Sequence, residues 1–154
     1  MKSLEFVREA EFFKKPMPKP IKILAIDDDY EIIEFLKFIL EPKEFDIITT
    51  ISGDQGIHLT HLVNPDIIIL DLLMPDLNGL SVCSEIRKFS SVPILVLSAV
   101  GKPEMIALAL DTGADDYLVK PITKNLLLAC IYKLTRRACA ERESLSANNN
   151  YRMI

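Results

Sequence analysis

The chain has 154 residues and a net charge of -4. Its length and its apolar fraction of 49% suit one domain with a hydrophobic core but not two full domains. The charged fraction of 26% argues against disorder, and so weak a charge gives no field that would hold nucleic acid, so no direct nucleic-acid contact is expected. No apolar run approaches the roughly 20 residues of a membrane span, and residues 1–20 lack the apolar stretch of a secretion signal. We therefore expect a cytoplasmic protein without membrane contact.

The cysteines favour no metal or disulfide framework. Cys83, Cys130 and Cys139 are odd in number, lie far apart, and form no group with His58 and His61. Free cysteine usually behaves as a small buried apolar residue, so we interpret all three as structural or incidental, with a redox switch as the alternative. The two histidines are expected on a helix surface or edge.

Residues 1–20 are predicted to form an N-terminal extension and a linker. The first part of this segment is mildly amphipathic, and its end, from Pro16 to Pro20, cannot continue a helix. Regular structure then begins with a strand at Ile21–Ile26. Asp29 is placed to cap the helix that follows, whose apolar residues are Ile32, Phe35, Leu36, Ile39 and Leu40.

A second strand and helix follow at Asp46–Ile51 and Gly53–Val63. The helix is indicated by residues at helical offsets, namely Ile57, His58, His61 and Leu62, and Asn64-Pro65 ends it. Asp66–Leu70 is apolar at consecutive positions, as expected for a central strand covered on both faces of a parallel sheet.

The remaining elements repeat the alternation. They are a helix at Leu80–Phe89, a strand at Pro93–Leu97, a helix at Pro103–Thr112 that Gly113 stops, a strand at Tyr117–Val119, and a helix from Ile122 onward. Five strands alternating with five helices predict an α/β fold, a doubly wound (βα)5 unit with a five-stranded parallel sheet.

Polar residues stand where these strands end. Asp27-Asp28-Asp29 follow the first strand, Asp71 the third, Ser98 the fourth and Lys120-Pro121 the fifth. Ligands of such sheets bind beyond the carboxyl ends of the strands, so these side chains should converge. Converging acids repel one another unless a cation lies among them, and an oxygen-rich cluster without histidine or thiolate suits Mg2+.

A carboxylate beside Mg2+ can attack phosphorus, because the metal neutralises the phosphoryl oxygens and aligns the displacement. Lys120 would supply a second positive charge, and Ser98 a hydroxyl donor for a phosphoryl oxygen. These groups describe an acyl-phosphate site rather than that of a sugar or peptide hydrolase.

Four segments carry a family resemblance: Ile23–Asp29, Asp66–Gly79, Pro93–Ala99 and Gly113–Pro121. Over residues 21–137 the chain resembles the response-regulator receiver domains of two-component signalling. The resemblance implies a flavodoxin-like strand order 2-1-3-4-5, and a sensor histidine kinase or phosphotransfer protein as phosphoryl donor.

The resemblance also implies a role for each site residue. Asp71 is the phosphoacceptor, Asp28 a direct Mg2+ ligand, Asp27 a ligand through water, and the Leu73 carbonyl a further ligand. Lys120 pairs with the phosphoryl group, or with Asp71 before phosphorylation, and the Lys120–Pro121 bond is expected to be cis. Ser98 is the switch hydroxyl and Tyr117 the switch aromatic.

The output face departs from the winged-helix branch of that family, in which the fourth helix, fifth strand and fifth helix dimerise through charged side chains. Ile106, Leu126 and Cys130 stand where that branch commonly has charged residues, and only Asp116 and the Arg136-Arg137 pair are retained. We hypothesise a more apolar face, for a homodimer or for a partner helix.

Residues 138–154 are expected to extend the last helix through Glu143 and to end in a polar tail. Either a stand-alone receiver or a piece of a longer regulator fits this pattern. Leu73 and Val100 stand two residues after Asp71 and Ser98, at positions that, by the family resemblance, influence access of the hydrolytic water. Both are apolar, so we predict slow self-dephosphorylation, because such groups exclude that water. We expect a phosphorylation switch and no enzyme. The alternatives are a phosphorylation-independent interaction module and a phosphatase-like or flavin-binding enzyme, whose flavin phosphate Asp27-Asp28 would repel.

Overall fold

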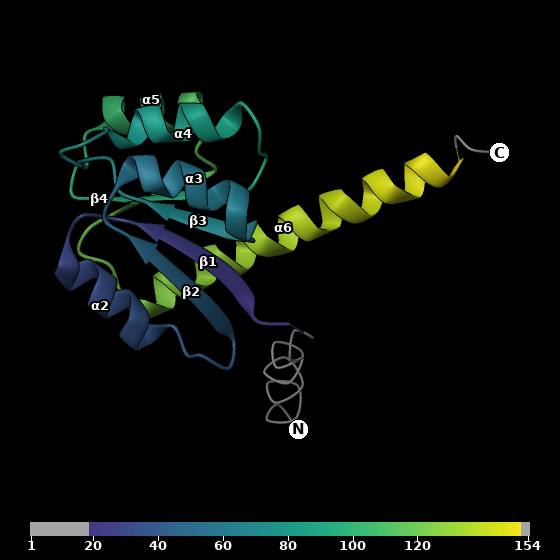
Figure 1. Cartoon of the computed structure of the whole chain (residues 1–154), viewed down its shortest axis with the longest axis horizontal. Coiled ribbons are helices and arrows are strands. Elements are labelled where there is room, and N and C mark those ends of the chain that lie inside the picture. Colours follow the sequence, from purple (N-terminus) through teal and green to yellow (C-terminus); the bar gives the residue numbers. More distant parts are fainter. Residues whose placement is uncertain (1–18, 152–154) are drawn as a thin grey trace, which may run out of the picture.

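The computed structural model describes residues 19–151, with side chains placed through residue 149. Its five parallel strands lie in the order β2-β1-β3-β4-β5, which confirms the expected fold and strand order (Figure 1). The strands are β1 (Ile21–Ile26), β2 (Phe45–Thr50), β3 (Ile67–Leu70), β4 (Ile94–Ser98) and β5 (Asp116–Val119). The helices are α2 (Tyr30–Ile39), α3 (Gly53–Val63), α4 (Gly79–Arg87), α5 (Pro103–Thr112) and α6 (Lys124–Tyr151). The amphipathic part of the expected N-terminal extension lies outside the described residues.

Helices cover both faces of the sheet. In Figure 1, α2 and α6 lie on one side, and α3, α4 and α5 on the other. Alternate residues of β1 belong to separate core clusters on the two faces of the sheet. Ile23 and Ala25 pack with α2 and α6, whereas Leu24 and Ile26 pack with α4. None of these four residues is exposed to solvent. Burial on both faces explains why the strands are apolar at consecutive positions.

Most element boundaries agree with the sequence pattern. The predicted bounds are correct for β1, α3 and α5. The predictions differ by one or two residues from the observed bounds of the other four strands, of α4 and of the start of α6. Asp29 caps α2 by accepting a 2.9 Å hydrogen bond from the Glu31 N–H. Asn64 and Gly113 end their helices at φ 47° and 123°, a backbone region that glycine and asparagine adopt most readily.

Helix α3 packs through only one of the four residues whose helical offsets indicated it. Ile57 packs against the core, and Leu62 is exposed. His58 and His61 are exposed as well, which confirms their expected place on a helix surface. The helix is buried instead through Gly53, Gly56 and Thr60. A Cβ at residue 56 would lie 2.4 Å from Ile26 Cδ1, so α3 approaches β1 as closely as a glycine allows.

Helix α6 is longer than expected. It spans 28 residues and continues to Tyr151, through most of the segment predicted as a polar tail. Figure 1 shows its C-terminal half projecting away from the sheet. From residue 136 to residue 149 only Ala138 is partly buried. Among residues 19–151 no helix has the length and apolar character needed to cross a membrane.

Candidate metal and phosphoacceptor site

Three aspartates from two neighbouring strands meet at the carboxyl edge of the sheet. Because Ile26 and Leu70 are register partners on β1 and β3, the residues that follow them lie side by side. Each of Asp27, Asp28 and Asp71 offers an oxygen within 4.8 Å of the other two. Asp27 and Asp71 are buried, whereas Asp28 is exposed. The structure therefore brings together the acids that the sequence singled out.

The backbone fixes two of these acids firmly. The Asp71 N–H donates to the Ile26 carbonyl at 2.9 Å, which extends the β1–β3 pairing by one bond beyond the strands. Asp27 Oδ1 accepts from the Asp29 N–H at 2.9 Å. Asp29, which caps α2, thus also holds the Asp27 carboxylate in place.

Lys120 reaches both buried acids from the end of β5. Its Nζ lies 2.8 Å from Asp27 Oδ2 and 3.9 Å from Asp71 Oδ1. The expected pair with Asp71 is present, but the shorter contact is with Asp27. The Lys120–Pro121 bond is cis, as the family resemblance implied.

Ionisation of Asp71 is unfavourable in this setting. Burial, followed by the charge of Asp27, raises its pKa from the ordinary 3.8 to about 6. The charge of Lys120 and a hydrogen bond from the Leu73 backbone oppose the rise, and Asp28 adds to it. One lysine does not compensate three converging carboxylates, so a divalent cation with a preference for oxygen fits this donor set.

Ser98 and Tyr117 are joined through one residue. Ser98 is buried at the end of β4, and its Oγ accepts from the Val100 N–H at 3.3 Å. The Tyr117 hydroxyl donates to the Val100 carbonyl at 2.5 Å. The two switch candidates therefore contact the N–H and the carbonyl of the same residue, Val100. Sequence reasoning missed this link because backbone groups carry no sequence signal.

Two further residues, which the sequence analysis did not identify, lie in or next to the loop from Leu72 to Asn78: Asp76 within the loop and Gly79 at the start of α4. Asp76 Oδ2 accepts from Ser52 Oγ and from the Gly53 N–H, each at 3.0 Å. Gly79, at the end of the loop, has no space for a side chain, because a Cβ there would lie 2.3 Å from the Asp71 carbonyl oxygen. Leu73, the expected carbonyl ligand, lies on this loop with its side chain 56% exposed.

The proposed output face is only partly as expected. Leu126 on α6 is 49% exposed and Ile106 on α5 is partly buried. Cys130 is buried in the core, so it is not part of the surface, which corrects the sequence interpretation. Asp116 forms a 2.6 Å ion pair with Lys133. Cys83 is also buried, while Cys139 is exposed.

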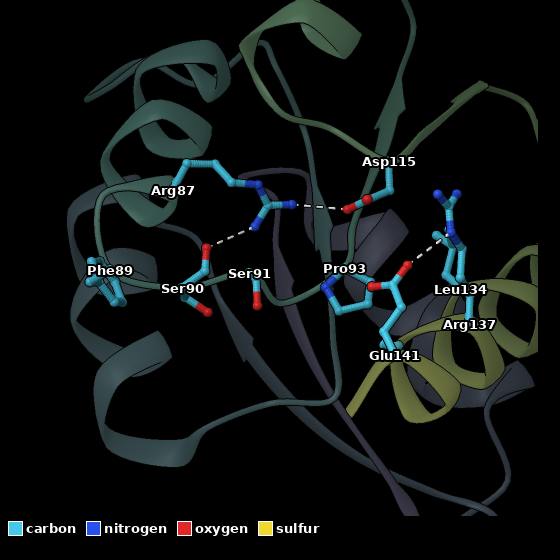
Figure 2. A pocket seen from close by; sticks show the side chains of 10 residues that line it. Arg87, Phe89, Ser90, Ser91, Pro93, Asp115, Leu134, Arg137 and Glu141 are labelled. Atoms are coloured by element: carbon cyan, nitrogen blue, oxygen red, sulfur yellow. Dashed lines mark hydrogen bonds and ion pairs between the residues drawn. The ribbon is translucent and has the colours of Figure 1, made fainter. Parts of the chain in front are cut away.

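A cavity of about 520 Å³ lies far from the acids, at the opposite ends of β4 and β5 (Figure 2). The Arg87 guanidinium donates there to three backbone carbonyls and forms a 2.9 Å ion pair with Asp115. Arg137 and Glu141 on α6 pair at 3.3 Å. The charged side chains that line this cavity are therefore paired with one another or with backbone carbonyls.

The doubly wound sheet, with acids, a hydroxyl and a lysine at the ends of its strands, defines an α/β protein whose candidate metal site lies at the carboxyl edge of the sheet, where such folds bind their ligands. Residues 23–132 match the family model of the response regulator receiver domain. The chain therefore belongs to that family, as the resemblance over residues 21–137 implied.

Known relatives agree with this assignment. A probable transcriptional regulator, ycf27, of Guillardia theta is 40% identical over 116 residues, which cover 75% of this chain and 46% of that protein. The DNA-binding response regulator MtrA of Mycobacterium tuberculosis is 36% identical, over 75% of this chain and 51% of that protein. The chain thus spans about half the length of these curated relatives.

Solved structures show the same fold. A two-component response regulator from Clostridium difficile has a TM-score of 0.73 and 32% identity, covering 76% of this chain and 97% of that one. The BeF3-activated receiver domain of RstA from Klebsiella pneumoniae has a TM-score of 0.71 and 27% identity, covering 75% and 98%.

Proposed function

We propose that this receiver domain is a phosphorylation switch in which Asp71 accepts a phosphoryl group from a sensor histidine kinase or phosphotransfer protein. The observation that supports this most directly is the convergence of Asp27, Asp28 and Asp71, with Lys120 reaching two of them. The proposal places the chain in the cytoplasm, where donors charged from ATP are available, and assigns it no membrane or direct nucleic-acid contact.

In the proposed transfer, an Asp71 carboxylate oxygen forms the new bond to phosphorus while the bond from phosphorus to the donor nitrogen breaks. The donor imidazole leaves with that electron pair. Asp27, Asp28 and Asp71, with the Leu73 carbonyl, would hold Mg2+, which supplies positive charge to the phosphoryl oxygens. The match of the donor set to a hard cation supports this assignment.

Lys120 and Ser98 complete the proposed site. Lys120 Nζ already lies within 4 Å of Asp71, so a small movement from Asp27 would pair it with a phosphoryl oxygen. Ser98 Oγ is buried at the next strand end and can donate to another phosphoryl oxygen. Its movement toward the phosphate would withdraw the acceptor of the Val100 N–H, and Val100 also holds the Tyr117 hydroxyl.

This connection suggests how a change at Asp71 would reach the face formed by α5, β5 and α6. Tyr117 is on β5 and packs partly against the core beside α5. A shift of Val100 alters the hydrogen bond that fixes the ring, and with it the surface offered to a second copy or another partner. The chain would thus act as a switch, not as an enzyme with a separate substrate.

The proposal is tested by incubating the protein with Mg2+ and acetyl phosphate and analysing it by intact-mass spectrometry. We expect one phosphoryl adduct that hydroxylamine removes and that peptide mapping assigns to Asp71. Asp71→Asn should form none, whereas Asp111→Asn, on an exposed residue at the end of α5, should react like the wild type. Metal binding without any adduct would refute the proposal and favour a phosphorylation-independent interaction module.

The same adduct tests self-dephosphorylation. Leu73 and Val100 stand two residues beyond Asp71 and Ser98, and both present apolar side chains. Because these side chains would exclude the attacking water, the phosphoryl adduct should have a half-life well beyond seconds once the donor is removed. A half-life of seconds would contradict this part of the proposal.

A further inference from the structure

The loop that leads from Asp71 to α4 is restrained on both sides. On the α4 side, the Gly79 N–H donates to the Leu72 carbonyl at 2.9 Å, and a Cβ at residue 79 would lie 2.6 Å from Leu72 Cα. The start of the loop is therefore in direct contact with the start of α4. Within the loop, Leu72 and Met74 are buried in the core cluster beneath it.

On the other side the loop is tied to α3, a helix that carries none of the proposed ligands. Asp76 Oδ2 accepts from Ser52 Oγ and the Gly53 N–H, 24 and 23 residues away in the chain. Ser52 is also the N-cap of α3, where its side chain accepts from the Gln55 N–H. Asp76 thus provides a second cap to a helix end whose free N–H groups favour a negative charge.

The Asp76 carboxylate is stable in its charged form. Burial acts against ionisation, but hydrogen bonds from the Ser52 hydroxyl and from the backbone of Leu77, Asp54 and Asp76 itself hold the pKa below 3.8. The contact with α3 is therefore charged throughout the neutral range, and charge-assisted hydrogen bonds are the stronger kind.

From these contacts we propose that Asp76 is a positioning residue for the metal site: by fastening the loop to the N-terminus of α3, it fixes where the Leu73 carbonyl lies relative to Asp71. This inference rests on the proposed function, because it assumes that Leu73 contributes to Mg2+ binding. Groups that orient metal ligands typically change metal affinity by about 10- to 100-fold when they are removed. Asp76 touches no reacting atom and acts only through the loop.

The test is the Mg2+ dissociation constant, measured by calorimetry with Mg2+ alone on the whole chain. Asp76→Ala should weaken binding by about tenfold, and Asp76→Asn, which retains one acceptor oxygen, by less. Phosphorylation by acetyl phosphate should slow in Asp76→Ala at low Mg2+ and recover at saturating Mg2+, because the reacting groups themselves are intact. A loss that saturating Mg2+ does not restore would contradict a positioning role.

Asp54→Ala is the matched control. It removes one carboxylate from the same end of α3 but keeps the backbone N–H that Asp76 uses, so it should change Mg2+ affinity less than about twofold, as for an ordinary surface charge. Equal losses in Asp54→Ala and Asp76→Ala would assign the effect to charge alone and overturn the inference. So would a wild-type affinity in Asp76→Ala.

Ser52→Ala removes one of the two donors to Asp76, leaving the Gly53 N–H, and supplies a test that remains valid if Asp76→Ala does not fold. Its Mg2+ affinity should also fall, and the double variant with Asp76→Asn should lose less than the sum of the two single changes. Fully additive effects would contradict the contact. A wild-type protein that binds Mg2+ but accepts no phosphoryl group would refute the proposed function, whereas unchanged Mg2+ affinity in these variants would refute only the role of Asp76.

Discussion

At the scale of single residues, the side chain of Asp71 is held where burial and neighbouring charge both oppose its ionisation. Lys120 offsets part of that cost, yet its shorter contact is with Asp27. The metal-free site therefore contains more negative charge than it can stabilise, which is the condition under which a cation binds well. The same imbalance makes the stability of the domain depend on pH.

The first prediction concerns that dependence. Because the folded chain raises the Asp71 pKa from 3.8 to about 6, ionised Asp71 destabilises the metal-free fold. The cost is absent well below pH 3.8, grows between pH 4 and 6, and is complete above about 6, where it is on the order of 3 kcal/mol. Asp71→Asn stays neutral, so its Tm should exceed that of the wild type most at pH 7 to 8.

This prediction is checked by measuring the Tm of both proteins at several pH values, with a chelator present to keep them free of metal. The difference in Tm between Asp71→Asn and the wild type should shrink as the pH falls toward 4. Saturating Mg2+ should reduce or reverse it at pH 7, because the ion stabilises only the ionised cluster. A difference that does not change with pH would show that Asp71 titrates at its ordinary value.

At the scale of elements, α3 illustrates how a helix can be held by its smallest residues. Gly53, Gly56 and Thr60 face the core, and the closest approach is between Gly56 and Ile26 on β1. This proximity also brings the N-terminus of α3 within reach of Asp76 on the neighbouring loop. The packing of α3 and the position of the loop are therefore parts of one arrangement.

A second prediction follows for Gly56→Ala. A methyl group placed 2.4 Å from Ile26 Cδ1 has to displace a fully buried side chain, so we expect a loss of about 1–3 kcal/mol in the free energy of unfolding. Urea unfolding measures it. Gly101→Ala is the control, because its Cβ would approach only Val119, at 3.3 Å. If helix propensity decided the outcome, Gly56→Ala would stabilise the protein by up to about 1 kcal/mol instead.

At the scale of the whole molecule, the two ends of the sheet differ in character. The carboxyl end of the strands holds the acids, while the other end holds the cavity of paired charges from which α6 projects (Figures 1 and 2). On α5, β5 and α6, Leu110, Val119 and Leu126 are each more than 40% exposed. These exposed apolar side chains support the hypothesis that the output face associates through apolar contacts.

A third prediction tests that face by analytical ultracentrifugation with beryllofluoride and Mg2+. Any dimer formed should persist in about 1 M salt, where screening acts within about 3 Å, because apolar burial does not depend on opposite charges. Leu126→Arg should weaken it, whereas Leu62→Arg, on a leucine of α3 that is 67% exposed against 49% for Leu126, should not. A dimer that dissociates readily in salt would contradict an apolar interface.

Some of this could be predicted from residue patterns because the determinants are local. Consecutive apolar residues in β3, the cap at Asp29 and the stop at Gly113 each act within a few residues, so they place elements to within one or two positions. The acids and Lys120 were also predictable, since strand ends of a parallel sheet meet at one edge. The C-terminal end of α6 could not be predicted, because no capping residue or proline in its polar segment signals the end of a helix.

The sequence by itself determined the alternation of elements, the fold class and the chemical types gathered at Asp27, Asp28, Asp71, Ser98 and Lys120. Only the tertiary structure decided which contacts those groups make. It gave Lys120 its shorter contact with Asp27, joined Ser98 to Tyr117 through Val100, buried Cys130, and fastened Asp76 to α3. The physical reason is that each of these contacts joins groups from separate elements, whose distance depends on how closely the elements pack rather than on any local pattern.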